Sequence, residues 1–158
     1  MNSTDLQQFI DEEKITAEIM TLDGHTPTVE DAARELKVEP EQIIKSLVFK
    51  VREEPILVIN NGTARVDRRK LAQYLAVGRK WARFASPELA LEITGFVVGS
   101  MPPFGHRTRL RTLVDSAVSD QAVIFGGGGD LNAMMRLTPA ELIRVTEAEV
   151  VSLSEGGA

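Results

Sequence analysis

Apolar positions along this chain follow two periods, and each period persists only over short stretches. Recurrence at every third or fourth residue predicts a helix, whereas strict alternation predicts a strand. Together with capping residues, the pattern predicts helices over residues 4–13, 28–37, 68–75, 86–95 and 138–145, and a helical turn over 40–44. It predicts strands over residues 16–22, 46–52, 56–60, 64–66, 83–85, 112–114, 121–125, 134–137 and 149–153.

One junction between predicted strands has a specific turn sequence. Asn61-Gly62 stands between two apolar stretches, and this dipeptide is typical of a two-residue β-hairpin. We therefore expect residues 56–60 and 64–66 to pair with each other. Strands and helices do not alternate regularly, which favours an α+β fold with a mixed, curved sheet. The 158 residues are expected to form a single domain, residues 1–158, with a loose tail over residues 154–158.

Composition narrows the class of protein. Apolar residues make up 43% of the chain and charged residues 26%, as in ordinary globular proteins. There is no cysteine, which excludes disulfides, thiolate metal sites and a cysteine nucleophile. The first residues show no secretory signal, and no stretch reaches the roughly 20 apolar residues of a membrane span. We therefore expect a cytoplasmic protein with no membrane partner.

The net charge of −5 hides an uneven distribution of charge. Residues 61–111 hold ten Lys and Arg against three Asp and Glu, whereas the remaining residues hold eight against twenty. A basic segment within an acidic chain favours one face for a polyanion and argues against a protein that coats nucleic acid. A solvated helix face explains the same charges. Binding to DNA is not expected.

The segment Gly99-Ser100-Met101-Pro102-Pro103-Phe104-Gly105 is the most informative part of the chain. Two prolines fix φ and remove backbone donors, and the flanking glycines allow conformations that other residues avoid. Such a loop is rigid and can present the N–H groups of Gly99, Ser100 and Met101 to a ligand. A purely structural turn is the alternative. Ser100 lacks the Gly-x-Ser-x-Gly surroundings of a hydrolase nucleophile.

Lys45 stands at the start of an apolar strand, where it shares a face with Leu47, Phe49 and Val51. Lysine is rarely buried without a partner. Its side chain either extends outward to water or projects into a polar cavity. In a cavity it would anchor a carbonyl, ester or phosphate oxygen.

The remaining candidates have simpler structural explanations. Gly126-Gly127-Gly128-Gly129 could cradle an anion, but it lacks the Gly-Lys-Ser/Thr ending of a P-loop, and a flexible hairpin loop also explains it. His25 and His106 are interpreted as ordinary loop histidines, and Trp81 as an anchor in the core. No spacing of His, Asp or Glu suggests a metal site, so we expect neither a metal nor a cofactor.

Several short motifs, taken in their order along the chain, resemble the YbaK/prolyl-tRNA-synthetase-associated domain family, the trans-editing aminoacyl-tRNA deacylases. They extend over nearly the whole chain, from about residue 25 to 150, and their order makes the resemblance specific. The motifs are Thr28-Val29-Glu30-Asp31-Ala32-Ala33, Ile43-Ile44-Lys45-Ser46-Leu47-Val48-Phe49, Val66-Asp67-Arg68-Arg69-Lys70-Leu71, Ala85-Ser86-Pro87-Glu88, Thr94-Gly95-Phe96-Val97-Val98-Gly99, Pro103-Phe104-Gly105, Leu113-Val114-Asp115 and Leu137-Thr138-Pro139.

The resemblance implies a barrel-like mixed sheet flanked by helices, and hydrolysis of the ester that joins a wrong amino acid to tRNA. It assigns catalytic roles to Lys45, which supplies positive charge, and to Gly99, whose backbone positions water or the ester carbonyl. Substrate contacts are expected from Ser100, Met101, Pro102, Pro103, Phe104, Gly105, Gly126, Gly127, Gly128, Met20 and Met134. Contacts with tRNA are expected from the basic residues Arg68, Arg69, Lys70, Arg79 and Lys80.

Three positions depart from the cysteine-editing members of that family. Those members carry a tyrosine near Met20, a serine at Gly127 and an aspartate at Met134, so the lining here is more apolar. This departure puts Cys-tRNA(Pro) in doubt and leaves alanine, serine, threonine or another small residue open. The expected partner is an aminoacyl-tRNA, with tRNA-Pro and a synthetase as candidates, and the oligomeric state is left open.

Two other functions compete with the deacylase. A non-catalytic module that binds aminoacyl-tRNA or its synthetase would show salt-dependent binding that survives Lys45→Ala, without turnover. A small-molecule ester hydrolase would cleave aminoacyl esters that lack tRNA with comparable efficiency.

Overall fold

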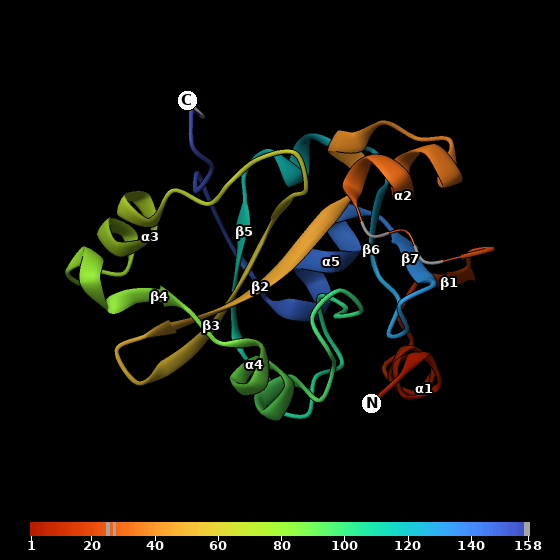
Figure 1. Cartoon of the computed structure of the whole chain (residues 1–158), viewed down its shortest axis with the longest axis horizontal. Coiled ribbons are helices and arrows are strands. Elements are labelled where there is room, and N and C mark those ends of the chain that lie inside the picture. The colour runs from red at the N-terminus through yellow and green to blue at the C-terminus, as the bar shows by residue number, and fades with distance from the viewer. Residues whose placement is uncertain (25, 27, 157–158) are drawn as a thin grey trace.

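The structure is a computed structural model that describes residues 1–24, 26 and 28–156, so His25 lies outside the described residues. Figure 1 shows short helices around two sheets, which confirms the α+β class. The helices of the described part are α1 (Ser3–Glu12), α2 (Val29–Leu36), α3 (Arg68–Tyr74), α4 (Pro87–Thr94) and α5 (Pro139–Thr146), with 3-10 turns η1 (Pro40–Gln42), η2 (Arg79–Trp81) and η3 (Val118–Asp120).

Capping residues explain where the helices begin. Thr28, Asp67, Ser86 and Thr138 each precede a helix, and each side chain accepts a hydrogen bond from a first-turn amide, as their sequence positions predict. The cap of α1 is Asn2, whose amide oxygen accepts hydrogen bonds from two backbone N–H groups, so the helix begins at Ser3, one residue before its predicted start.

The strands form two sheets and not one curved, barrel-like sheet; neither closes on itself within the described residues. The strands are β1 (Glu18–Thr21), β2 (Ile44–Val51), β3 (Glu54–Asn61), β4 (Ala82–Phe84), β5 (Arg111–Asp115), β6 (Ile124–Gly127), β7 (Ala133–Leu137) and β8 (Glu149–Val151). The larger sheet has the order β4-β2-β3-β5-β8, with β3, β5 and β8 parallel. The smaller sheet is antiparallel, with the order β1-β7-β6.

The two sheets meet where β2 begins. Ile43, just before β2, forms an isolated parallel bridge with Phe125 of β6. Both side chains are buried against Ala32 and Ala33 of α2, which covers the smaller sheet at this point. In Figure 1 α2 lies above the β6–β7–β1 sheet and α1 lies below it, while α3 and β4 lie at the opposite side of the molecule.

The predicted hairpin at Asn61-Gly62 is wrong. β3 forms its hairpin with the preceding strand β2, through a two-residue turn at Arg52 and Glu53. The other neighbour of β3 is the distant strand β5. Gly62 instead brings the chain close to α2: its N–H donates to the carbonyl of Ile43 at 2.6 Å. A Cβ at this position would meet the side chain of Val29 at 2.5 Å.

The predicted loose tail is held at its first two residues. Ser154 is buried and bridges to Val66, and the N–H of Glu155 donates to the carbonyl of Arg65. This part of the tail therefore belongs to the fold. No helix in the described part of the chain is long and apolar enough to cross a membrane.

Candidate functional site

The Gly99–Gly105 segment belongs to a closed loop that starts at the end of α4. Gly95 ends the helix in the left-handed region at φ 84°. At the base of the loop, the N–H groups of Arg107 and Thr108 donate to the carbonyls of Thr94 and Ile93 at 2.9 and 3.2 Å. Both ends of the loop are therefore fixed to α4.

Four N–H groups of the Gly99–Gly105 segment, those of Gly99, Met101, Phe104 and Gly105, have no hydrogen-bond partner within the described part of the chain. Ser100 is buried, and its N–H and hydroxyl both donate to the carbonyl of Val97, at 3.1 and 2.9 Å. The N–H groups of Gly99 and Met101 donate to none of the described acceptors. Gly99 is exposed with φ 96°, so its amide can reach a ligand. The loop thus presents two of the three donors expected from its sequence.

The residues expected to line the amino-acid pocket lie in one row across the smaller sheet. Met20 of β1 is the register partner of Met134 of β7, which in turn is the partner of Gly127 of β6. Met20 and Met134 are half-buried and pack against the cluster under α2. At the end of the row, a Cβ on Gly127 would lie 2.7 Å from the carbonyl carbon of Met101. The row therefore ends directly at the backbone of the proline-containing loop.

The glycine segment serves close packing. A Cβ on Gly126 would lie 3.2 Å from Ile44, and one on Gly128 would lie 2.6 Å from the backbone of Ala133. The N–H groups of Gly128 and Gly129 already donate to the carbonyls of Ala133 and Ser100, at 3.0 and 2.9 Å. Because these two N–H groups already have hydrogen-bond partners, they are not available to an anion, as the cradle considered from the sequence would require.

Lys45 lies one residue inside β2, and it shares a strand face with Phe49, as the alternation predicts. It is exposed and has no hydrogen bond or ion pair among the described residues. The residue before it, Ile44, packs at Gly126, so the base of Lys45 is near the inner end of the row. The ammonium group is therefore open to solvent.

Two orphaned polar atoms flank Lys45 and were missed in the sequence. Asn60 is its partner on β3 and only 1% exposed, yet its Oδ1 accepts no hydrogen bond from the described residues. The Oγ atom of Ser46, the next residue of β2, is buried and also has no partner. Asn60 was predicted as the last residue of the strand before the turn Asn61-Gly62, and its position opposite Lys45 follows from the pairing of β2 with β3.

The basic residues expected at the tRNA lie on α3 and η2, away from the row. Two of them are engaged in the fold: Arg68 donates to the carbonyl of Ala82 at 2.8 Å, and Lys70 donates to that of Ser154 at 2.8 Å. A hollow of about 480 Å³ beside the start of α3 is lined by residues that include Arg68, Arg69 and Arg79.

Trp81 is not the core anchor that its sequence suggested. It is 40% exposed, and the side chains of Arg52 and Lys80 each lie 5.4 Å from its ring centroid. Cations at this distance interact favourably with the face of an indole. Trp81 ends η2, directly before β4, which is an edge strand of the larger sheet, and its ring is partly open to solvent there.

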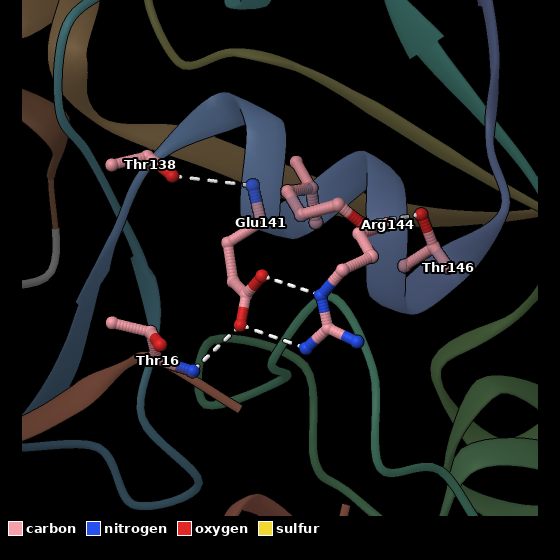
Figure 2. Close-up of polar contacts among 6 residues, drawn as sticks. Thr16, Thr138, Glu141, Arg144 and Thr146 are labelled. Atoms are coloured by element: carbon pink, nitrogen blue, oxygen red, sulfur yellow. Dashed lines mark hydrogen bonds and ion pairs between the residues drawn. The ribbon is translucent and has the colours of Figure 1, made fainter. Parts of the chain in front are cut away.

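A charged cluster fastens the strand that carries Met20. Figure 2 shows the Glu141 carboxylate of α5 facing both Nε and Nη2 of Arg144, at 2.6 and 2.8 Å. The same carboxylate accepts from the N–H of Thr16 at 2.6 Å, just before β1. The hydrogen bonds from Arg144, and then that from Thr16, lower the pKa of Glu141 to about 2.

A similar cluster links β5 to the edge strand β8 of the larger sheet. Arg111 of β5 donates to both carboxylate oxygens of Glu149 on β8 at 2.8 Å, and the hydroxyl of Tyr74 donates to Glu149 at 2.7 Å. These bonds, that of Arg111 first, lower the pKa of Glu149 to about 2. Across the described residues, no three His, Asp or Glu side chains gather as they would around a metal ion.

Sequence relatives include proteins of this length and larger enzymes. The uncharacterized protein YwhH of Bacillus subtilis is 31% identical over 134 residues, which cover 84% of this chain and 83% of that protein. A proline–tRNA ligase of Streptococcus equi is 28% identical over 98% of this chain, and one of Lactiplantibacillus plantarum is 29% identical over 65%. The matched regions are 26% and 18% of those ligases.

Solved structures and a family model agree with these relatives. A structure titled as that of "a putative trans-editing enzyme for prolyl tRNA synthetase" has a TM-score of 0.91 and 32% identity, covering 98% of this chain and 97% of that one. The hypothetical protein APE2540 has a TM-score of 0.88 and 26% identity, covering 96% and 99%. The model of the aminoacyl-tRNA editing domain matches residues 23–145. With the row and the loop at one place in such a fold, the chain belongs to the aminoacyl-tRNA editing domain family.

Proposed function

We propose that this protein is a deacylase that hydrolyses the ester between a small amino acid and the tRNA to which it was wrongly attached. The observation that carries this proposal is the junction of the apolar row with the loop: Gly127 abuts Met101, whose amide and that of Gly99 have no partner among the described residues. The residues proposed to contact the amino-acid side chain and the donors proposed for the ester thereby meet at one point.

The reaction needs positioned groups and no covalent intermediate. Water attacks the ester carbonyl, its hydroxyl becomes part of the released carboxylic acid, and the ribose oxygen leaves with a proton. The Gly99 amide orients the carbonyl or the water, and the Lys45 ammonium stabilises the negative charge that develops on oxygen. Loss of one such preorganised donor costs about 10²–10³ in rate.

The lining of the row favours a small, apolar amino acid. Met20 and Met134 offer thioethers that adapt to the shape of a ligand but donate no hydrogen bond. Alanine fits this chemistry best, and serine and threonine are the next candidates. A cysteine substrate is disfavoured, because the tyrosine, serine and aspartate of cysteine-editing relatives are absent from these positions.

Contact with the rest of the tRNA belongs to the same proposal. We expect Arg69, Arg79 and Lys80 to meet phosphates, whereas Arg68 and Lys70 donate to backbone carbonyls. A synthetase for proline is the candidate protein partner, since the matched relatives include proline–tRNA ligases. We place this activity in the cytoplasm, where tRNA is charged.

A non-catalytic tRNA-binding module is the second candidate. The surface that favours it is the basic region at α3 and η2, where Lys80 and Arg52 flank the exposed Trp81. Such a module would bind tRNA in a salt-dependent way and leave the ester intact.

The decisive experiment is deacylation of tRNAs charged with Ala, Ser, Thr, Cys and Pro by the wild type and by Lys45→Ala. The matched control is Lys14→Ala, which removes an exposed lysine at the end of α1. We expect one small amino acid to be released by the wild type and the control, and a 10²–10³-fold slower release by Lys45→Ala. If none of the charged tRNAs loses its amino acid faster than in buffer alone, while tRNA binding is measurable, the binding module would replace the deacylase as the proposed function.

A further inference from the structure

The interior of the proline-containing loop is held by a single hydrogen bond. Between Met101 and Gly105, one backbone group in the described structure has a hydrogen-bond partner: the carbonyl of Pro102, which lies 2.7 Å from Nε2 of His106. Pro102 and Pro103 have no N–H to donate, which leaves the loop with few backbone hydrogen bonds. Its interior is therefore held by this one hydrogen bond and by packing, which includes the contact of the Phe104 ring with that of Phe9 at 5.8 Å.

The chemistry of the partner determines the state of that imidazole. A carbonyl oxygen only accepts, so Nε2 of His106 carries the proton. Burial lowers the pKa of His106, which keeps the ring neutral at physiological pH and restricts it to the Nε2–H tautomer. The ring also meets the fully buried ring of Phe96 edge-on, with centroids 6.2 Å apart, and this contact fixes its plane.

The loop borders a cavity, so packing does not hold it on every side. The cavity has a volume of about 80 Å³ and is lined by residues that include Phe9, Phe104, His106 and Val145. A void removes the contacts that would otherwise resist a shift of the backbone. Without the bond from His106, Pro103 and Phe104, which line this space, can shift into it and move the linked amide of Met101.

We propose that His106 is a positioning residue that aligns the free amides of the Gly99–Gly105 loop with the ester through its bond to the Pro102 carbonyl. This inference rests on the proposed function, because it gives the loop its role in the reaction. His106 does not touch the reacting atoms; it acts through the backbone.

Two variants separate the hydrogen bond from the ring. His106→Phe keeps a flat ring against Phe96 and removes the donor, whereas His106→Gln loses the ring and keeps an N–H donor at a similar reach. We expect His106→Phe to lower kcat for deacylation about 10- to 100-fold with a smaller change in KM, since misplacement by about 1 Å has an effect of this size. His106→Gln should recover most of the rate.

Two measurements do not depend on turnover. Nitrogen NMR of the wild-type imidazole should show the Nε2–H tautomer. Amide hydrogen exchange at Met101, Phe104 and Gly105 should be faster in His106→Phe than in the wild type or His106→Gln, at equal unfolding midpoints. If His106→Phe does not fold, the tautomer of the wild-type imidazole and the deacylation rate of His106→Gln still test the role of His106.

The outcomes separate the two proposals. Wild-type kcat in His106→Phe, a glutamine variant as slow as the phenylalanine one, or an Nδ1–H tautomer would each overturn the role of His106. A wild type that releases no amino acid from any tRNA would remove the proposed function instead. In that case, unchanged exchange in His106→Phe would overturn the positioning role as well, and faster exchange would support it.

Discussion

Two glycine-rich segments meet in this molecule, and they need glycine for opposite reasons. Gly99 has φ 96° and open space around it, since a Cβ there would approach no atom closer than 3.5 Å, on Leu131. Gly127 has no such φ, but a Cβ there would lie 2.9 Å from the carbonyl oxygen of Ser100 and nearer still to Met101. The first glycine is required by conformation and the second by lack of room.

The difference shows why a run of glycines is a poor sign of a ligand site. The longer run, residues 126–129, has its amides at Gly128 and Gly129 bonded and its Cβ positions filled by neighbours. The loop with isolated glycines is the one that leaves donors free. Counting glycines would have chosen the wrong segment, whereas accounting for each backbone N–H chooses the right one.

The largest effect should come from filling the space at Gly127. In Gly127→Ala the new methyl group meets backbone atoms of Ser100 and Met101, which cannot rotate away. We expect a loss of about 3 kcal/mol in unfolding free energy and at least a 100-fold loss of deacylation. Denaturant unfolding and single-turnover release measure both. Gly24→Ala is the control, because a Cβ there meets nothing within 4 Å; equal stability of the two variants would contradict the packing argument.

A smaller effect is expected from changing conformation without crowding. Gly99→Ala forces an alanine into the left-handed region, at a cost of roughly 1–2 kcal/mol. Gly156→Ala, at φ 70° and in open space, should have a similar cost. Only Gly99→Ala should slow deacylation, by about 10-fold, because only that backbone carries a donor of the site. Equal rates in both variants would show that the Gly99 amide is not used.

Removing the charge of Glu141, which bonds to the residue before β1, should lower stability and leave the N–H groups of the Gly99–Gly105 loop unchanged. Glu141→Gln weakens the bonds from Arg144 and Thr16 that Figure 2 shows. We expect a loss of about 1–2 kcal/mol, or a Tm lower by a few degrees. Deacylation should stay within about twofold of the wild type at temperatures where the variant is folded. Glu147→Gln, whose carboxylate is exposed 3.6 Å from Arg109, is the control and should change little.

The smallest effect is a dependence on pH. The pKa of Glu141 is lowered from 4.5 to about 2 in the folded protein, so its stabilising contribution is complete above pH 4.5 and is lost as the pH falls toward 2. Unfolding free energies measured between pH 5 and 2.5 should therefore fall more steeply in the wild type than in Glu141→Gln. Parallel curves would contradict the assignment of this carboxylate. Glu149 titrates in the same range and contributes equally to both proteins.

Most elements could be predicted because their determinants are local. Caps such as Thr28 and Ser86 and the alternation in β2 depend on neighbouring residues, and the structure has each helix within one or two residues of its predicted range. The error at Asn61-Gly62 arose because β3 pairs with β5, about fifty residues later, and because the actual hairpin turn, Arg52-Glu53, contains neither Asn nor Gly. No local signal distinguishes these pairings.

Much of the candidate site could also be anticipated, but not its assembly. The resemblance gave Met20, Gly127 and Met134 as separate positions, and the register of three strands brings them into one row. The sequence does not reveal which amides remain unbonded, because that depends on contacts such as Ser100 with Val97 and Gly129 with Ser100. His106 was interpreted as an ordinary loop histidine for the same reason: its partner is a carbonyl, which leaves no trace in sequence.

The position of Met20 on β1 has a consequence for how this fold can change over evolution. β1 and β6 are the two edge strands of this sheet, but β6 also bridges to the start of β2, whereas β1 pairs only with β7 among the described strands. Exchanges at the rim of a sheet are tolerated better than exchanges inside it. A lineage can therefore alter the row at its β1 end, one residue at a time, while the loop and Gly127 stay as they are.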